Sequence, residues 1–416
     1  MKKIFLVAFT LTFLIINQLK ANKEVIINYS NIAEANYKDA LVLAQQLHNS
    51  ILDFMKNTND ENFNLVKISW LKSRTAYQQT EVFRFGNPIV DDWEGKVNAW
   101  PLDEGLIDYV DNTNYYPSEN DFSNFNVIAN KNLKVEGELI DASIINTDLL
   151  STKLHEIGGN EANVAIGYHA IEFLLWGQDL NGTKEGNGNR KYTDFRLEQC
   201  TNDNCDRRRE YLLAASELLI EDLKFINNAW SSEGDAREDL INDNENAIKR
   251  ILVGMGSLSY GELAGERMKL GLMLHDPEEE HDCFSDNTHN SHYYNVVGIK
   301  NVFLGEYRNL EGKLISGPSI SSMLKVADKK LQKKTKKSIN RTIKNMKKIV
   351  KSAENGMTYD MLIAEGNKKG NKLIQKAIDS LVVQSKNIEL VANALNVQNL
   401  QIEGSESLDN PDAVFN

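Results

Sequence analysis

The sequence predicts an all-α protein built from two helical-bundle lobes. The 416 residues include only 6 prolines, and long stretches without proline favour helix over a turn-rich β fold. Apolar residues recur at three- and four-residue steps along much of the chain, which is the pattern of helices with one buried face. A polar segment rich in Gly and Asn, 181–204, separates two groups of such stretches, and its composition indicates a linker.

The first 21 residues have the pattern of a secretory signal peptide. Lys2 and Lys3 precede a 13-residue apolar run, 4–16, and the small residue Ala21 follows it, an order typical of a cleaved export signal. The run is shorter than the roughly 20 residues that a membrane-spanning helix needs. We therefore expect an exported protein, periplasmic or associated with the cell surface, without a transmembrane segment.

Each lobe is expected to open with a pair of amphipathic helices. We predict these pairs, and two further long helices, at 36–55 and 63–86, at 206–230 and 245–273, and at 319–353 and 370–395. We place the boundary in the linker, so that the lobes are 22–185 and 186–416. The similar plan of the two pairs suggests a duplication, which is a hypothesis because no sequence identity between them supports it.

The charge of the chain argues against one class of partner. The formal net charge is −12 and the pI is about 5.2, whereas proteins that bind nucleic acids use basic faces. We therefore expect no nucleic-acid partner. An acidic protein attracts cations, although solubility alone also explains this sign.

Three cysteines leave several pairings open. Cys200 and Cys205 flank the polar stretch TNDN, and a local disulfide is favoured in an oxidising compartment. Their spacing is a poor match to a zinc cluster. Free thiols, or a bond from one of them to Cys283, are also compatible with the sequence.

The motif GYHAIE (167–172) lies inside an apolar stretch, 163–179. On a helix, His169 and Glu172 share one face with Cβ atoms about 5–6 Å apart, a separation suited to two ligands of one cation. Gly167 leaves room for a neighbouring backbone or a ligand. Because buried polar groups need partners, the alternative is a core pair in which the two side chains satisfy each other.

Two other segments place carboxylates in aromatic surroundings. Glu81 has an aromatic residue one helical turn away on either side. Asp103 and Glu104 follow Trp100 where a helix would begin, and acids are also ordinary first-turn residues at such a place. These carboxylates are candidates for additional ligands of a cation held by His169 and Glu172.

The segment 261–295 is rich in ligand-type side chains. It contains four histidines, at 275, 281, 289 and 292, interspersed with acidic residues. Such a cluster coordinates a metal or positions a substrate; the alternative is a solvated acidic loop that caps the next helix. Arg267 lies in an otherwise small and apolar stretch and needs a carboxylate partner if it is buried. Glu266 is one candidate for that partner.

Several enzyme motifs are missing from the sequence. We find no HExxH, no inverted HxxEH, no GxSxG, no phosphate-binding loop and no GxGxxG. The sequence therefore identifies no catalytic residue.

Together, these motifs resemble the imelysin family, which includes insulin-cleaving metalloprotease and iron-regulated protein A. The similar blocks occur in family order and are W-x3-R-x2-Y-x3-E-x-FRFG (70–86), VNAWPLDEGLIDY (97–109), GYHAIEFLLWGQD (167–179), CDRRREYL (205–212), GELAGERM (261–268) and HDCFSDNTHNSHYYN (281–295). The last two blocks make the chain look closest to the iron-regulated protein A branch.

The resemblance implies two duplicated helical lobes with a cleft between them, the GxHxxE motif in the first lobe and GERM and SDNTH in the second. It implies His169, Glu172 and Glu81 as metal ligands, with Asp103 as a fourth by approximate position. The residues expected to line the cleft are Trp100, Glu104, Gly167, Glu266, Arg267, Ser285, Asp286 and His289. One nitrogen and three oxygens favour iron or another hard cation, with zinc as the second choice.

We therefore predict a protein that binds a metal ion, or a small iron-bearing ligand, in iron uptake or homeostasis. Other envelope proteins of iron uptake are further candidate partners. The first alternative is a metallopeptidase that uses the same HxxE pair, although no separate general base is evident. The second alternative is a binding protein without a metal, in which His169 and Glu172 only satisfy each other.

Overall fold

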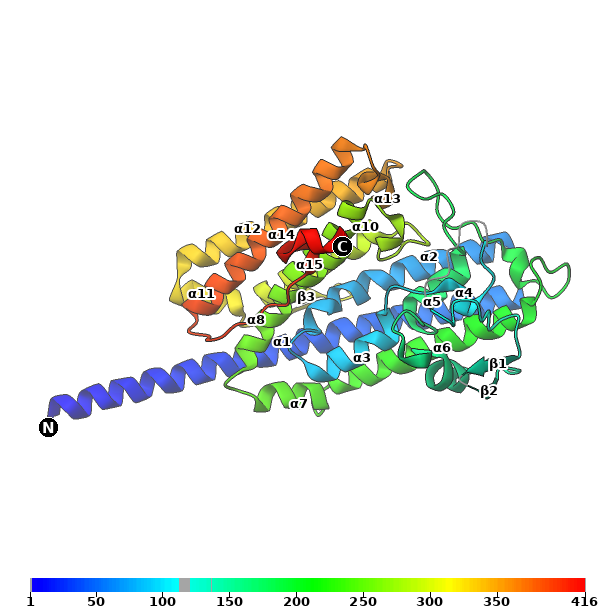
Figure 1. Cartoon of the computed structure of the whole chain (residues 1–416). Helices are drawn as coiled ribbons and strands as arrows, with labels where there is room; N and C mark the ends of the chain where they lie inside the picture. The colour runs from blue at the N-terminus through cyan, green and yellow to red at the C-terminus, as the bar shows by residue number, and fades with distance from the viewer. Residues whose placement is uncertain (1, 112–119, 136, 416) are drawn as a thin grey trace.

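The structure, a computed structural model, describes residues 2–111, 120–135 and 137–415. It is 66% helical with 4% strand, which confirms the predicted all-α class (Figure 1). The helices of eight or more residues are α1 (Lys2–Lys56), α2 (Asp60–Tyr77), α3 (Pro88–Asn98), α5 (Gly167–Trp176), α6 (Cys205–Ala229), α7 (Asp235–Asn242), α8 (Ala247–Ser257), α10 (Thr288–Leu304), α11 (Ile320–Ala327), α12 (Lys329–Glu354) and α14 (Lys368–Ala394).

Short α-helices, 3₁₀ turns and two π-helical segments join them. These are α4 (Glu104–Ile107), α9 (Gly271–Leu274), α13 (Tyr359–Ile363) and α15 (Glu406–Asp409), the 3₁₀ turns η1 (Gln78–Phe83), η3 (Ile157–Gly159), η4 (Tyr192–Phe195), η6 (Pro277–Glu279) and η7 (Pro411–Phe415), and the π-helical segments η2 (Leu149–Leu154) and η5 (Leu258–Leu270). The predicted helix 245–273 thus corresponds to α8, η5 and α9 in succession. Its middle part is a π-helix, a form often found at functional sites.

The strands form two small antiparallel hairpins. One pairs β1 (Asn132–Val135) with β2 (Glu138–Asp141), with Leu133 opposite Ile140. The other pairs β3 (Glu306–Arg308) with β4 (Leu314–Ser316), with Tyr307 opposite Ile315.

The helices pack around two hydrophobic cores. The larger core includes the inner faces of α1, α2, α3, α5 and α6. The smaller core joins η5, α12, α13 and α14 through residues such as Met268, Met346 and Ile374. Figure 1 shows the corresponding groups, with α1, α2, α3 and α6 together and α12 and α14 side by side elsewhere.

The packing of α6 bears on the predicted lobe boundary. This helix follows the boundary at 185–186, yet it packs against α1 and α5. A division after α7 would keep α6 with the helices that it contacts. The two-lobe division and the duplication stay predictions.

The long helix α1 includes most of the predicted signal peptide. Its backbone is helical from Lys2 and its first part projects from the other helices (Figure 1); residue 1 lies outside the described residues. Within the described part of the chain, no helix combines the length and the apolarity needed to cross a membrane. Cleavage after Ala21 stays a prediction.

The three cysteines differ in their bonding. Cys200 and Cys205 form a disulfide at the start of α6, with Cα atoms 5.9 Å apart. Cys283 is a free, buried thiol, and burial raises its pKa well above the ordinary value.

Gly167 determines how closely α5 approaches α3. Its φ is +82°, and a Cβ atom there would lie 2.6 Å from the carbonyl oxygen of Val97, near the end of α3. Only glycine accommodates both the left-handed backbone and this contact. The space next to Gly167, which the sequence assigns to a neighbouring backbone or a ligand, is therefore occupied by the backbone of α3. This close approach of Gly167 to Val97 positions α5, the helix that carries His169.

We expect the substitution Gly167→Ala to lower the free energy of unfolding by about 3 kcal/mol. About 1 kcal/mol comes from the left-handed conformation and about 2 kcal/mol from overpacking against Val97. The matched control is Gly182→Ala, because Gly182 has φ +61° but no atom within 4 Å of an added Cβ. Urea unfolding of both variants measures the difference, and equal losses would contradict the role of the Val97 contact.

Candidate functional site

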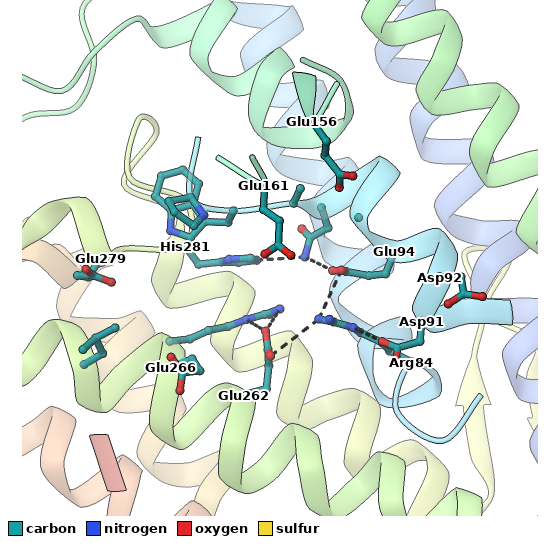
Figure 2. Close-up of a pocket in the computed structure, with 17 residues that line it drawn as sticks. Arg84, Asp91, Asp92, Glu94, Glu156, Glu161, Glu262, Glu266, Glu279 and His281 are labelled. Carbon is teal, nitrogen blue, oxygen red and sulfur yellow. Dashed lines mark hydrogen bonds and ion pairs between the residues drawn. The ribbon is translucent and has the colours of Figure 1, made fainter. Parts of the chain in front are cut away.

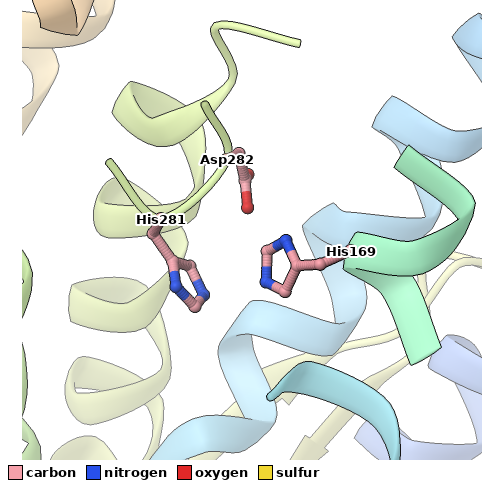
Figure 3. Close-up of side chains that lie close together, drawn as sticks. All are labelled: His169, His281 and Asp282. Atoms are coloured by element: carbon pink, nitrogen blue, oxygen red, sulfur yellow. The ribbon is translucent and has the colours of Figure 1, made fainter. Parts of the chain in front are cut away.

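Three buried side chains from two distant segments meet at one point. His169 comes from α5, and His281 and Asp282 come from the turn between η6 and α10. One ligand atom from each lies within 4.8 Å of the others (Figure 3). In the described ranges, this is the one group of three or more His, Cys, Asp or Glu side chains with that geometry.

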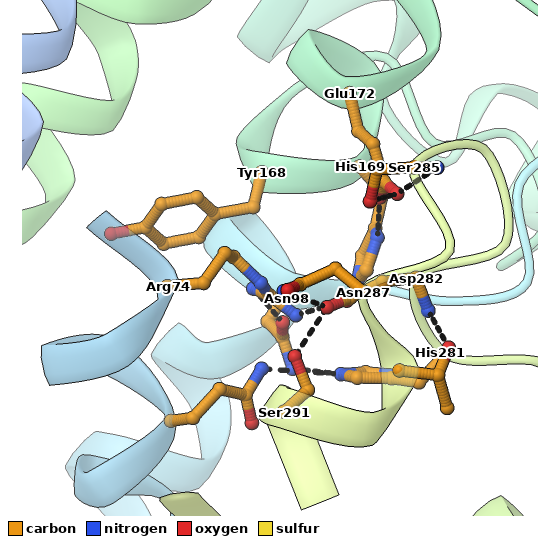
Figure 4. Close-up of polar contacts among 12 residues, drawn as sticks. Arg74, Asn98, Tyr168, His169, Glu172, His281, Asp282, Ser285, Asn287 and Ser291 are labelled. Atoms are coloured by element: carbon orange, nitrogen blue, oxygen red, sulfur yellow. Dashed lines mark hydrogen bonds and ion pairs between the residues drawn. The ribbon is translucent and has the colours of Figure 1, made fainter. Parts of the chain in front are cut away.

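The hydrogen bonds of His169 leave one ring nitrogen available. Nδ1 lies 3.0 Å from Oε2 of Glu172, while Nε2 is buried without a partner. Oε1 of Glu172 accepts from the backbone N–H of Ser285 at 3.0 Å and from its hydroxyl at 2.6 Å (Figure 4). Metal-binding histidines commonly donate their second N–H to such a carboxylate. Glu172 therefore lies where it would orient His169, with both of its oxygens engaged.

Asp282 lies at the centre of a buried polar network. Its Oδ1 accepts from Nη2 of Arg74 at 2.7 Å, and its Oδ2 accepts from Asn287 at 2.9 Å and from the Ser291 hydroxyl (Figure 4). Burial alone would raise the pKa of Asp282, but the positive charge of Arg74 and these hydrogen bonds hold it below the ordinary value. Asp282 is therefore ionised and its charge is largely balanced by Arg74.

The two histidines are neutral imidazoles. Burial, followed by the charge of Arg74, lowers the pKa of His169 well below 6.5, and burial followed by Arg267 does the same for His281. Amide nitrogens of Asn98 and Gln78 lie 3.4 and 3.5 Å from Nε2 of His281. A neutral imidazole retains the lone pair that a metal ion requires.

An acidic pocket of about 640 Å³ reaches this group at His281. Arg84 and Arg267 are the basic residues of its lining (Figure 2). The acidic lining residues are Asp91, Asp92, Glu94, Glu156, Glu161, Glu262, Glu266 and Glu279. Because acids outnumber bases here, the pocket concentrates cations.

Glu81 is not a member of the group formed by His169, His281 and Asp282. It belongs to η1, and its Oε2 accepts from Nη2 of Arg267 at 2.8 Å. Arg267 also donates from Nε to Glu262 at 2.6 Å. Arg267 is thus buried with carboxylate partners, as the sequence suggests, although the partners are Glu81 and Glu262, and Glu266 lines the acidic pocket instead. The role of Glu81 as a metal ligand stays a prediction.

Asp103 and Glu104 line a different pocket, of about 660 Å³. Asp103 accepts a hydrogen bond from Asn120, and Glu104 accepts from Gln178 at 2.8 Å. Burial, followed by the charge of Glu278, raises the pKa of Glu104 to about 8. Trp100 lines both pockets, and its ring centroid lies 5.2 Å from that of His169.

The other predicted cleft residues have different positions. Ser285 contacts Glu172, as described above, and Gly167 contacts the end of α3. Asp286 adopts a left-handed backbone with φ +58°, and His289 lies in the first turn of α10. Neither Asp286 nor His289 lines the acidic pocket.

The sequence does not single out His281, Asp282 or Arg74 as site residues. His281 and Asp282 lie in a segment whose density of histidines and acids was a signal for ligands. The resemblance places the neighbouring SDNTH segment in one cleft with His169, but it does not single out His281 or Asp282 as ligands and assigns no role to Arg74.

The fold and the site define an all-helical protein in which a buried group of two histidines and one carboxylate lies beside an acidic pocket. The family model described as Imelysin matches residues 33–388. The chain belongs to the imelysin family, as the sequence motifs predict.

Solved structures show the same fold. A structure described as an iron-regulated protein A precursor from Parabacteroides distasonis ATCC 8503 is 18% identical, with a TM-score of 0.65, and the match covers 90% of this chain and 95% of that one. An imelysin-like protein from Psychrobacter arcticum 273-4 is 13% identical, with a TM-score of 0.59 and coverage of 91% and 96%. A search of curated proteins gives no significant match.

We expect Glu104→Gln to reduce the pH dependence of stability between pH 6.5 and 8. In this range the folded protein retains a proton on Glu104, whose pKa is about 8, whereas the unfolded chain does not. Stability therefore falls as the pH rises, by up to about 1.4 kcal/mol per pH unit for this group. Urea unfolding at both pH values measures the slope, with Glu389→Gln, an exposed change on α14, as the control. Equal slopes in wild type and Glu104→Gln would contradict the prediction.

Proposed function

We propose that this protein is an exported metal-binding protein that takes a metal ion at His169, His281 and Asp282. The supporting observation is that Nε2 of His169 is buried without a partner, and that His169 belongs to a group of three residues whose ligand atoms lie within 4.8 Å of one another. A buried polar atom without a partner is costly, and a cation would satisfy it.

The donor types suit iron, with zinc as the second choice. Two histidines and one carboxylate form the set that non-haem iron(II) sites use, with coordination positions left open, and imidazole also suits zinc. His169, His281 and Asp282 would hold the ion, and Glu172 would orient His169. This set has more nitrogen than the oxygen-rich site predicted from the sequence.

The charge around His169, His281 and Asp282 also favours a metal that is coordinated mainly by the two imidazole nitrogens. Arg74 balances most of the charge of Asp282 through their 2.7 Å ion pair, so the attraction for a cation is modest at this point. The acidic pocket supplies the longer-range attraction, and the imidazoles supply the coordinate bonds. A site that binds mainly through imidazole nitrogens suits a transition metal better than a cation such as Ca²⁺, which binds mainly through carboxylate oxygens.

We propose a role in iron uptake or homeostasis, with other envelope proteins of iron uptake as candidate partners. The name of the Parabacteroides relative, an iron-regulated protein A precursor, and the signal-peptide pattern at the N-terminus support this role. A volume of about 640 Å³ lies in the range of small-molecule sites, so a small iron-bearing ligand in the pocket is part of the same proposal.

The geometry favours binding over peptide hydrolysis. A hydrolytic metal site needs a general base beside the bound water. Glu172 is fully buried, and both of its oxygens already accept or share hydrogen bonds with His169 and Ser285. Glu172 is therefore poorly placed to activate a water molecule, and the family's peptidase label is the less favoured alternative.

We expect His169→Ala and His281→Ala each to weaken binding of Fe²⁺ and Zn²⁺ strongly, because each removes a ligand. Glu172→Gln should weaken binding by about 10- to 100-fold, as changes in residues that orient ligands do. Isothermal titration of each metal into chelator-stripped protein gives the affinities. His48→Ala is the matched control, since His48 instead contacts Ser216 at 2.8 Å. Unchanged iron binding in a His169→Ala, Glu172→Ala double variant would overturn the proposal.

We expect the acidic pocket to accelerate metal association. The triple variant Glu156→Gln, Glu161→Gln, Glu266→Gln should lower the association rate about threefold to tenfold and reduce its salt dependence. The dissociation rate should change little, because these residues do not touch the ligands. Stopped-flow mixing measures both rates, with Glu354→Gln, Asp379→Asn, Glu389→Gln as a control of equal charge change on α12 and α14. Equal association rates in the two triple variants would show that ions reach the site by another route.

A further inference from the structure

The helix α12 has a strongly basic surface that the proposed metal site does not use. Eleven of its 26 residues are Lys or Arg, and its one acidic residue, Glu354, is the last. All eleven basic residues are exposed. The whole chain carries a formal net charge of −12, so α12, which lies beside α14 in Figure 1, is a basic strip on an otherwise strongly acidic protein.

The basic residues lie on the face opposite the one that α12 buries. The buried residues recur at three- and four-residue steps and include Leu331, Thr335, Thr342, Met346 and Ile349, where α12 packs against α10, α11 and α14. At 3.6 residues per turn, the basic residues all fall within about half of the helix circumference, on the other side. This strip runs along the helix for roughly 39 Å, at 1.5 Å per residue.

The charges of the strip are not compensated within the chain. A solvated helix face commonly mixes basic and acidic residues that pair at four-residue spacing. Here Lys333 and Lys337 repel each other at that spacing, and so do Lys344 and Lys348. Among the described residues, no basic residue of α12 forms an ion pair. A helix that concentrates one sign of charge in this way loses stability, so the strip calls for a partner outside the chain.

We propose that the exposed face of α12 is a docking surface for a membrane that contains anionic lipids. The phosphate groups of such lipids form a flat and extended negative surface, which a straight basic strip complements in charge and in shape. Amphipathic helices with Lys and Arg along the polar face are typical of proteins that bind anionic headgroups. The signal-peptide pattern predicts export, which brings the protein to lipid surfaces and separates it from intracellular nucleic acid.

The composition of the strip favours lipid over a protein partner. Protein interfaces are enriched in aromatic residues and Arg and depleted in Lys, whereas α12 has no aromatic residue and Arg341 is its one arginine. Lysine binds phosphate as a flexible point charge, which suits mobile headgroups. A second copy of the chain is the other acidic candidate, but the acidic side chains described above line a pocket, and a straight helix fits a pocket poorly.

The test is co-sedimentation with vesicles of phosphatidylglycerol mixed with phosphatidylcholine, and with vesicles of phosphatidylcholine alone. The protein is purified in the form that cells export, and binding to the neutral vesicles measures any contribution of the apolar run 4–16. We expect wild type to prefer the anionic vesicles and to be released by salt. The variant Lys333→Gln, Lys337→Gln, Lys344→Gln, Lys351→Gln should bind them about a hundredfold more weakly, because each lysine near an anionic surface contributes about fivefold.

Two further variants separate the role of α12 from general effects of charge. The variant Lys131→Gln, Lys134→Gln, Lys191→Gln, Lys224→Gln removes the same charge from exposed lysines outside α12 and should leave vesicle binding nearly unchanged. Arginine at the four α12 positions should retain binding. The α12 glutamine variant relieves repulsion, so its unfolding temperature should not fall below that of wild type.

Four results would overturn the inference. Wild type would bind both kinds of vesicle equally, the two glutamine variants would bind alike, or the arginine variant would bind no better than the α12 glutamine variant. The fourth is an α12 glutamine variant that keeps vesicle binding but loses a self-association of wild type, measured by analytical ultracentrifugation without vesicles. That result would assign the face to a second copy of the chain.

Discussion

The arrangement of the site depends on the buried ion pair between Arg74 and Asp282. Both side chains are almost fully buried and lie 2.7 Å apart. Arg74 also donates to Asn98 at the end of α3, and its guanidinium lies 4.9 Å from the ring centroid of Tyr168 in α5. One side chain of α2 thus holds α3, α5 and the turn before α10 in register. Removing one partner of such a pair costs about 3–5 kcal/mol, because the other charge is left buried and uncompensated.

The pair also explains why an apolar helix contains a histidine and a glutamate. Every residue of α5 is buried, so the charge and the hydrogen bonds of His169 and Glu172 must be satisfied from outside the helix. The turn before α10 provides this by donating from Ser285 to Glu172 and by placing Asp282 beside His169. Since Arg74 holds the turn in place, the polar residues of α5 and those of the turn are stable only together.

Local patterns in the sequence predict the helices and place His169 and Glu172 on one helix face, because both depend on residues a few positions apart. Those local patterns do not predict which residues far apart in the sequence contact each other. The period of 3.6 placed Glu81 on a continuous helix, but the helix tightens to 3₁₀ at Gln78, which changes the direction of Glu81. Its partner, Arg267, is 186 positions away. Likewise, composition identified the segment containing His281, yet the choice of His281 over three other histidines depends on how the turn packs against α5.

The turn between η6 and α10 contains the buried carboxylates of Asp282 and Glu280, whose charges are compensated differently. At Asp282 a neighbouring arginine balances the carboxylate, so what remains to attract an ion is the lone pairs of two neutral imidazoles. At Glu280, a short distance along the chain, the neighbours are carboxylates, and no arginine of the described residues pairs with them. The first environment favours metals that bind nitrogen. In the second, burial raises the pKa of Glu280 well above its ordinary value. The position of Arg74 therefore decides which carboxylate of this turn keeps a balanced charge beside the two histidines.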